Sequence, residues 1–557
     1  MEPCLQLKKS NCKNCYKCIR FCPVKSIRFS DNQAHIIADE CILCGRCYVN
    51  CPQNAKQIRN DVEKAKALIA AGKPVYVSLA PSYTANYKVS IDAMEEALQA
   101  LGFTAAEETA VGATIVKKRY EEMVAGREQK VIISSCCHTV NTLIQKKYPI
   151  ALNYLAKVLS PMQAHCARLK TTHPDCYTVF IGPCIAKKDE TDHSAGLVDC
   201  ALTFEELSDW MREEGVVLRD LPDTRDPARA RLFPSCGGIL QSMDLEEAYS
   251  YIAVDGIENC MAALEDIENG NLNNCFVEMS ACTGSCIGGP GMEREKIHHL
   301  QELVALRKTA KKMDHDLVMP DHTMLYKSFP FEGRNQQMPG SSAIEEILRK
   351  MGKHSPEQEL NCGSCGYNTC REKAVAVLNG KADLTMCLPY LKEKAESFSD
   401  KIINNTPNGI FVLNEQLELQ QMNNAAQKIL NVKRQSDVQG EPVMRLLDPT
   451  DYLLCMTEGK NIYEKNKYLD EYEKYVEETV IYDKEYHIIM SIMKDVTEEE
   501  KMRENKDSHN RRVIEITDKV VEKQMRVVQE IASLLGETTA ETKIALTKLK
   551  ETLADEE

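Results

Sequence analysis

The sequence predicts a multidomain chain that combines α+β and α/β units. Its 557 residues are too many for one hydrophobic core, and about 150 residues per domain gives three to five units. Clustered cysteines occur repeatedly between positions 12 and 387. Between these clusters, apolar runs of strand length alternate with amphipathic stretches of helix length, which is the pattern of an α/β core.

The composition excludes several classes of protein. A net charge of −14 argues against a nucleic-acid-binding protein, because such proteins present a basic surface. No apolar run approaches the roughly 20 residues that span a bilayer, and the opening MEPCLQLKKS lacks the apolar segment of a secretion signal. We therefore expect a cytoplasmic protein without a membrane or nucleic-acid partner. Because structural disulfides are rare in a reducing cytoplasm, the 25 cysteines indicate metal binding or catalysis.

Residues 1–58 contain one cysteine motif twice. Each copy has the spacing C-x2-C-x2-C-x3-C and is followed by proline. This spacing is typical of bacterial two-cluster ferredoxins, in which the fourth cysteine of each motif ligates the other 4Fe-4S cluster. Two zinc knuckles are the alternative, and the repeated Cys-Pro ending disfavours them. The predicted ligand sets are Cys12, Cys15, Cys18 and Cys51 for one cluster, and Cys41, Cys44, Cys47 and Cys22 for the other.

Residues 59–352 are predicted to form an α/β domain. Buried strands are expected in GKPVYVSLAPSY, KVIISSCCHT and YTVFIGPCIAKKDE, and an amphipathic helix is expected in IDAMEEALQALGF. Three loops are rich in cysteine or glycine: SSCCH (134–138), GPCIAKKDE (182–190) and EMSACTGSCIGGPG (278–291). Loops at strand ends commonly carry function, so these three are the candidate site.

These three loops, in this order and behind the two-cluster motif, resemble the signatures of the iron-only (FeFe) hydrogenases over residues 1–350. The resemblance implies reversible conversion of H2 to protons and electrons. It also implies a 4Fe-4S cluster on four cysteines, one of which bridges to a diiron unit that carries CO, cyanide and a bridging dithiolate. The implied ligands are Cys137, Cys184, Cys282 and the bridging Cys286.

The resemblance implies further roles around the diiron unit. Cys136 matches the cysteine that passes protons to the bridging amine, although an inert buried thiol is the alternative. Lys187 matches the lysine that points at one cyanide. The remaining implied contacts are Ala80, Pro81 and Ser82 near the other cyanide, Gly237 and Gly238 beside the distal iron, and Ser280 where the family has methionine.

The outer proton path departs from the family pattern. Ungapped alignment places Lys118 where the family has one relay glutamate and Ala156 where it has a serine, whereas Glu121 keeps the second glutamate. A lysine ammonium donates but does not accept. We therefore expect slow turnover limited by proton delivery, unless another water-filled path, such as one through His138, replaces this one.

Residues 353–394 are predicted to form a small domain with a fourth cluster. The spacing C-x2-C-x4-C-x16-C resembles a four-cysteine 4Fe-4S domain found in several redox proteins, with zinc as the alternative metal. The expected ligands are Cys362, Cys365, Cys370 and Cys387. The intervening REKAVAVLNG is expected to be a helix that ends at Gly380.

The remaining chain resembles a sensor. GIFVLN and the later strand–Asp-Val-Thr–acidic helix pattern resemble PAS domains, which gives a predicted PAS domain at 395–497 with Cys455 and His487 as possible cofactor contacts. Residues 498–557 are expected to form a helical signalling or dimerisation tail, because apolar residues step by four and three between Val521 and Leu535.

Together these patterns predict a hydrogenase of the sensory type. It would respond to H2 or redox state through a homodimeric PAS domain and tail, with ferredoxin as an electron partner and a phosphatase or kinase as a signalling partner. A metabolic, ferredoxin-coupled hydrogenase is one alternative. The other is a hydrogenase-like iron–sulfur assembly protein without the diiron unit, which Cys136 and Lys187 disfavour because they would serve only the diiron chemistry.

Overall fold

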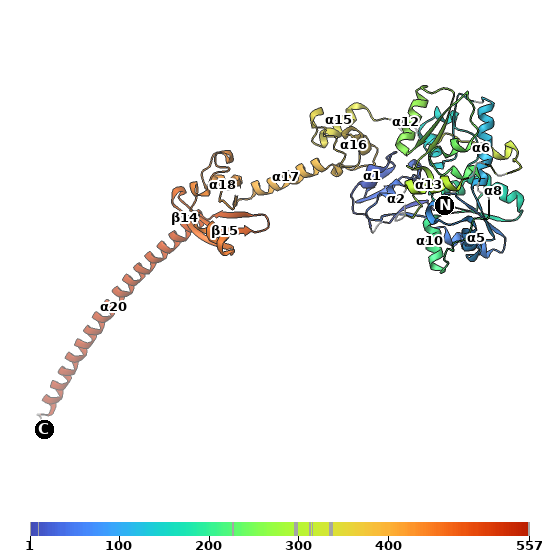
Figure 1. Cartoon of the computed structure of the whole chain (residues 1–557). Coiled ribbons are helices and arrows are strands. Elements are labelled where there is room, and N and C mark those ends of the chain that lie inside the picture. Colours follow the sequence, from blue (N-terminus) through green and yellow to red (C-terminus); the bar gives the residue numbers. More distant parts are fainter. Residues whose placement is uncertain are drawn as a thin grey trace. The chain divides into compact units, whose positions relative to one another are not determined.

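The computed structural model divides into two compact units, 1–391 and 392–557. Figure 1 colours the chain along its sequence and labels its elements. The structure describes residues 2–8, 11–127, 129–225, 228–293, 299–310, 313–314, 316–333 and 338–554. The expected mixture of α/β and α+β units is confirmed. The predicted boundary at 394/395 falls inside one helix, α17 (Leu388–Asn405).

The first unit begins with a small cysteine-rich module. Strands β1 (Leu5–Leu7) and β4 (Lys56–Ile58) pair in antiparallel fashion, as do β2 (Ile27–Ser30) and β3 (Gln33–Ile36). The β2–β3 turn has two residues with positive φ, Asp31 and Asn32, which is the geometry of a tight hairpin. Each cysteine motif contains one short helix, α1 (Lys17–Phe21) or α2 (Arg46–Val49).

Two parallel sheets form the centre of the first unit. The four-stranded sheet has the order β6-β5-β8-β9, from Ala105–Glu108, Val75–Leu79, Tyr177–Gly182 and Cys200–Thr203. The three-stranded sheet has the order β10-β11-β7, from Ser250–Asp255, Cys275–Ser280 and Val131–Ile133. All pairs in both sheets are parallel, so the carboxyl ends of neighbouring strands lie at a common edge.

Helices pack around these sheets because their apolar faces need a core to bury against. The predicted amphipathic helix is α5 (Ile91–Ala100), which buries Ile91, Met94 and Leu98. The other helices are α3 (Val62–Ala70), α4 (Tyr83–Tyr87), α6 (Ala110–Ala125), α7 (His138–Lys147), α8 (Pro161–Thr172), α9 (Ala186–Asp192), α10 (Phe204–Glu213), α11 (Gly238–Ser242), α12 (Ile257–Glu268), α13 (His299–Thr309) and α14 (His322–Leu325).

The small four-cysteine module completes the first unit. Its central helix α16 (Cys370–Leu378) ends just before Gly380, as predicted, and Gly380 has a positive φ of 67°. Helix α15 (Ser341–Lys350) packs on this module, because Leu348 shares an apolar cluster with Ala374 and Cys387. The helix therefore lies with the module, although the predicted start at residue 353 separates the two.

The second unit contains a five-stranded antiparallel sheet in the order β13-β12-β16-β15-β14. Its core includes Phe411, Val480, Ile489 and Met493, so the buried face of the last strand carries the odd-numbered residues. The strands are β12 (Gly409–Asn414), β13 (Leu419–Met422), β14 (Ile462–Leu469), β15 (Lys474–Asp483) and β16 (Ile488–Asp495), and the helices beside them are α18 (Asn424–Ile429) and α19 (Thr450–Glu458).

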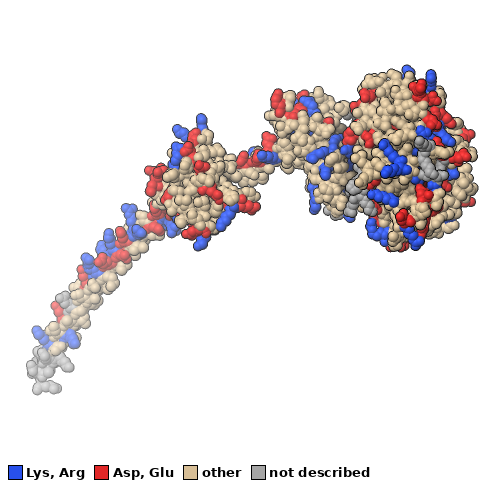
Figure 2. All heavy atoms as spheres, viewed as in Figure 1, with Lys and Arg blue, Asp and Glu red and all other residues tan. Residues whose placement is uncertain are grey.

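The predicted charged tail is one long helix, α20 (Thr497–Ala554). Its apolar residues Val521, Met525, Val528 and Leu535 are each more than half exposed. Figure 2 shows acidic and basic side chains interspersed along the visible face of α20 and over the strands before it. In the part of the chain that the structure describes, no helix combines the length and the apolar character that crossing a membrane requires.

Candidate iron–sulfur and active site

Four loops at the carboxyl ends of parallel strands meet around one cavity. They follow β5, β7, β8 and β11, so the two sheets supply two loops each. Ligand sites in parallel sheets occur at this edge because the loops there converge. The cavity has a volume of about 120 Å³. Of the predicted site residues, it is lined by Ala80, Pro81, Ser82, Cys136, Cys137, Cys184, Lys187, Ser280 and Cys286.

The four predicted ligands of the active-site cluster lie together. Burial raises the pKa of Cys184 to about 11, and Cys137 adds to that rise. Burial also raises the pKa of Cys282 well above its usual value. Three other thiols act in the same direction because they lie within electrostatic reach: Cys137, Cys184 and Cys286. Such crowded buried thiols become thiolates only beside a strong positive charge, which cluster iron supplies.

The cavity walls also suit a polar group. Cys286 is enclosed by protein yet leaves its thiol exposed to the cavity. The buried hydroxyl of Ser82 has no hydrogen-bond partner among the described residues. A bound group with an acceptor atom would satisfy this donor, since buried polar atoms are rarely left unpaired. The lining therefore fits a cofactor that carries anionic ligands.

Cys136 lies beside the ligand Cys137 and has different neighbours. Its Sγ atom is 3.3 Å from the hydroxyl of Tyr120, on α6, and that hydroxyl is 3.1 Å from Oγ of Ser135. Burial raises the pKa of Cys136 to about 12, so the thiol keeps its proton at neutral pH. The structure thus brings a protonated thiol to the cavity, with Tyr120 as a neighbour that the sequence did not indicate.

Lys187 reaches the same place from α9. Its Nζ donates to the backbone oxygen of Cys136 at 3.2 Å and to Oε2 of Glu190 at 2.5 Å. Lys327 approaches the other Glu190 oxygen at 2.8 Å. Although Glu190 is buried, these two ammonium groups hold its pKa well below its usual value. Lys187 is therefore a fixed cation at the cavity wall.

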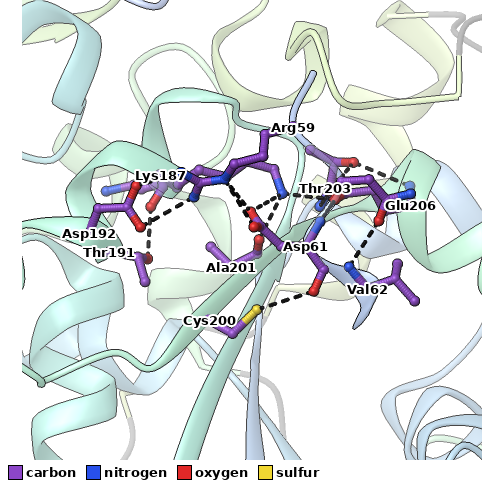
Figure 3. Close-up of polar contacts among 12 residues, drawn as sticks. Arg59, Asp61, Val62, Lys187, Thr191, Asp192, Cys200, Ala201, Thr203 and Glu206 are labelled. Atoms are coloured by element: carbon purple, nitrogen blue, oxygen red, sulfur yellow. Dashed lines mark hydrogen bonds and ion pairs between the residues drawn. The ribbon is translucent and has the colours of Figure 1, made fainter. Parts of the chain in front are cut away.

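A buried charge network anchors α9. Lys188 is 1% exposed, and its Nζ lies 2.8 Å from both Asp61 and Glu206. Arg59 bridges Asp61 at 2.9 Å and Asp192 at 2.8 Å (Figure 3). The network joins the segment before α3 to α9 and α10. It fixes the helix that carries Lys187. None of its members had a predicted role, although Lys188 stands in the loop 182–190.

Glu278 is a second cavity residue that the sequence analysis missed. It is 3% exposed on β11, and burial raises its pKa to about 7. The backbone N–H of Leu240 donates to its Oε2 at 3.1 Å. Glu278 also raises the pKa of Cys136, so the two groups lie within electrostatic reach. One acid inside an otherwise apolar strand was the available signal, because burying a carboxyl group requires a compensating role.

Four residues predicted for this site do not line the cavity. Cys282 lies among the other three cluster thiols, and the remaining three are Glu121, Gly237 and Gly238. Glu121 accepts from the backbone N–H of Asp244 at 2.8 Å and does not line the cavity, because Tyr120 is the α6 residue that faces Cys136. Gly237 and Gly238 also lie outside the lining, because they form the start of α11. Their backbone amides stabilise the Glu278 carboxylate.

The cysteines of the N-terminal module form two groups that combine the two motifs. Burial raises the pKa of Cys18 to about 11, with further increases from Cys12, Cys15 and Cys51. Burial also raises the pKa of Cys47 well above its usual value, and Cys44, Cys41 and Cys22 add to it. Each fourth cysteine therefore lies with the first three of the other motif, which is the arrangement that two 4Fe-4S clusters require.

The second of these groups is next to the candidate active site. Cys44 lies within electrostatic reach of Cys282. Gly45, with φ of 71°, packs so closely on the active-site loops that a Cβ atom there would lie 2.6 Å from Pro290 and 2.9 Å from Ile185. The two sites are therefore in direct contact.

The third cysteine group lies in the small module. One cavity there is lined by Cys362, Cys365, Cys370 and Cys387. The cavity brings the four thiols to one place, as the sequence predicts. Four thiolates suit either an iron–sulfur cluster or zinc.

The two suggested PAS contacts do not share a pocket. Cys455 is buried, with its Sγ 3.7 Å from the backbone oxygen of Val480. The His487 side chain is 70% exposed and pairs with Glu415 at 2.8 Å. Cys455 is therefore a core residue and His487 a surface residue.

Comparison with known proteins agrees with this arrangement. Residues 73–290 match the family model of the iron-only hydrogenase large subunit, C-terminal domain. Residues 4–52 match a 4Fe-4S dicluster domain, residues 358–389 match the FeS family of small cluster domains, and residues 398–467 match the PAS fold.

Individual relatives are distant. Iron hydrogenase 1 of Clostridium pasteurianum is 25% identical over 309 residues, 43% of this chain and 54% of the relative, so the chain spans about half of its length. The periplasmic iron hydrogenase large subunit of Nitratidesulfovibrio vulgaris is 24% identical over 364 residues, 52% of this chain and 86% of the relative. A cytosolic Fe-S cluster assembly factor of Encephalitozoon cuniculi is 24% identical over 208 residues, 32% of this chain and 56% of the relative.

The parallel sheets and the clustered thiols define an iron–sulfur protein. Residues 73–290 carry the match to the iron-only hydrogenase domain, and the chain joins this region to matches with a dicluster domain, a small cluster domain and the PAS fold.

Proposed function

We propose that the protein interconverts H2 with protons and electrons at the cavity beside Cys286. The observation that carries this proposal is the pairing of Cys136 and Lys187 on one cavity wall with the cluster thiols. A cluster that only transfers electrons needs neither an acid–base thiol nor a fixed cation beside an open space. In the proposed site, Cys137, Cys184, Cys282 and Cys286 would hold a 4Fe-4S cluster, and Cys286 would also help to hold the diiron unit.

The residues around the diiron unit would have separate roles in proton transfer, orientation of the unit and exclusion of water. When bound, the diiron unit supplies the metal chemistry by which the H–H bond is cleaved or formed. Cys136 would hold a proton at Sγ and take it up or release it at the cavity. Lys187 and Ser82 would donate hydrogen bonds to the anionic ligands of the unit and so orient it. Apolar side chains in the lining, such as Met162 and Phe180, limit the access of water.

Glu278 supports a proton route that differs from the expected one. Its carboxyl group, with a pKa of about 7, can both accept and release a proton near neutral pH, and it lies within electrostatic reach of Cys136. This route does not need Glu121. The route also does not need a hydroxyl at position 156, where this chain has alanine in place of the family's serine. Ala156 is fully buried in an apolar cluster with Ile132.

Electrons would pass through the two N-terminal clusters to a soluble partner such as ferredoxin. The contact of Gly45 and Cys44 with the active-site loops supports electron passage between the active site and the N-terminal clusters. The cofactor complement would then be four 4Fe-4S clusters, one of them in the active site, and the diiron unit.

We assign the PAS unit and α20 a sensory role. The hydrogenase would report H2 or redox state to a signalling phosphatase or kinase, as a homodimer formed through the PAS unit and α20. The exposed apolar seam of α20 supports a helical partner. A metabolic, ferredoxin-coupled hydrogenase, in which PAS serves only assembly, is the alternative within the same chemistry.

Infrared spectroscopy of protein matured with the diiron cofactor tests the central proposal. We expect CO and cyanide bands, together with H2 evolution from a reduced dye. The similarity to an Fe-S cluster assembly factor favours one competing function, a scaffold that binds clusters without the diiron unit. Normal iron–sulfur content without CO and cyanide bands would support the scaffold and reject the hydrogenase.

A further inference from the structure

The small four-cysteine module packs directly on the N-terminal dicluster module. The backbone N–H of Phe29 donates to the oxygen of Lys381 at 2.8 Å, and Nζ of Lys25 donates to the oxygen of Gly366 at 2.9 Å. Gly366 has φ of 91°, and a Cβ atom there would lie 2.9 Å from the side chain of Ile19. More than 300 residues separate these partners along the chain, so the contact is a tertiary interface between the two modules.

Tyr367 lies at the centre of this interface. It is 3% exposed, lines the four-cysteine cavity, and belongs to the same apolar cluster as Ile19. Its hydroxyl has no hydrogen-bond partner among the described residues. Burial raises the pKa of Tyr367, and charge on Cys365 and on Cys22 raises it further. The ring therefore lies between a predicted ligand of the small module and a predicted ligand of the dicluster module.

Two lysines flank this tyrosine, one from each module. Nζ of Lys25 is 6.0 Å from the ring centroid of Tyr367, and Nζ of Lys373 is 5.9 Å from it. Burial lowers the pKa of Lys25, and charge on Cys22 and on Cys365 acts in the opposite direction. The ammonium group of Lys25 therefore lies near both predicted cluster sites. A partly buried cation such as Lys25 beside an iron–sulfur cluster favours the reduced form, which carries one more negative charge.

We propose that Tyr367 and Lys25 form an electron-transfer contact between the cluster held by Cys22, Cys41, Cys44 and Cys47 and the cluster of the small module. The first of these clusters would then be a branch point, because its other side meets the active-site loops at Gly45. One electron moves from the reduced dicluster site, which becomes oxidised, to the oxidised small-module cluster, which becomes reduced. No covalent bond forms or breaks.

The branch leads toward the second unit. Cys387 is a predicted ligand of the small-module cluster, and α17, the helix that continues into the PAS unit, begins at the next residue. The inference rests on the proposed function for the source of electrons, since H2 is the reductant. Each H2 that is oxidised to two protons supplies two electrons, enough to reduce the branch-point cluster and the small-module cluster once each.

A redox titration tests the contact without the diiron unit. Full-length protein reconstituted with iron and sulfide is reduced stepwise with dithionite and followed by EPR. We expect Lys25→Met to make two clusters harder to reduce, by about tenfold each, or ~59 mV for a one-electron couple. Tyr367→Phe, which keeps the ring, should shift only the small-module cluster, because it removes the hydroxyl donor.

Arg20→Gln is the matched control. Arg20 donates to the oxygen of Ser364 at 3.2 Å across the same interface, but it lies on the exposed side. We expect wild-type potentials and iron content in this variant. Unchanged potentials in Lys25→Met at full iron content, or zinc in the small module, would overturn the proposal.

Freeze-quench EPR of matured protein mixed with H2 tests the electron flow. We expect Tyr367→Leu to slow reduction of the small-module cluster at least tenfold, while the dicluster signals develop as in the wild type. Equal rates in the two proteins would overturn the branch. If H2 reduces no cluster in the wild type, the hydrogenase proposal itself is rejected, and the dithionite titration alone decides on the contact.

Discussion

The buried network around Lys188 predicts a large and specific loss of stability in Lys188→Met. The substitution keeps the volume of the side chain but removes the ammonium group that lies 2.8 Å from both Asp61 and Glu206. Lys188 is 1% exposed, Asp61 7% and Glu206 8%, so water cannot replace the lost ammonium. Breaking such a pair costs about 3–5 kcal/mol, because it leaves buried charge uncompensated.

The assay is urea unfolding of the full chain with intact clusters, followed by near-UV circular dichroism. With an m-value of about 3 kcal/mol/M, the loss lowers the midpoint of the first unit's transition by about 1 M or more. Glu206→Gln in the same chain should restore part of the stability, because Glu206 loses its cationic partner Lys188 whereas Asp61 keeps Arg59 at 2.9 Å. Lys350→Met is the control, since the Lys350–Glu346 pair is more than half exposed.

Two results would refute this reasoning. One is a midpoint in Lys188→Met that equals that of the control. The other is strict additivity of Lys188→Met and Glu206→Gln, which would mean that the two charges do not interact. Infrared spectra of the matured variant should also show shifted cyanide bands, because α9 carries Lys187 one residue earlier.

Three further predictions concern the site and the tail. Cys136→Ala should keep the CO and cyanide bands and lose nearly all turnover, whereas Cys137→Ala should lose the bands; equal loss of cofactor in both would contradict the separate roles. Glu278→Gln should lower H2 evolution by about 10²-fold or more. The wild-type rate should fall as pH rises through about 7, since only the protonated carboxyl group donates, and a variant that kept this pH profile would argue against the route. The fragment 392–557 should have the mass of a dimer in light scattering. A monomer at high concentration would count against the apolar seam of α20 as a dimer contact.

Most of the correct predictions came from the spacing of residues that lie close together in the sequence. The cysteine motifs of the dicluster and small modules could be recognised because ligand spacing within one motif is a local property. The active-site cysteines lie on three loops, and only the resemblance of those loops to a known family indicated them. The alternation of strands and helices indicated the α/β core for the same reason, and the helix at Ile91–Ala100 appears where its apolar period placed it. The PAS fold likewise followed from two strand signals at 409–414 and 488–495.

The missed features depend on contacts between distant residues. Tyr120 faces Cys136, which alignment by residue type could not indicate, because no carboxylate or serine marks the position. Glu121 is the next residue along α6, and one step turns a helix by about 100°, away from the cavity. The Tyr367 contact joins segments more than 300 residues apart, and neither side carries a pattern that depends on the other.

The close approach at Gly45 constrains how such a chain can change over evolution. Any side chain at this position would collide with Pro290 or Ile185, and φ of 71° would strain the backbone as well. A substitution at one position therefore requires smaller partners at two others, which lie in separate active-site loops. The dicluster module and the domain that it packs against are for this reason expected to vary together. A dicluster module taken from another protein would fit here only if it brought a glycine at the same turn.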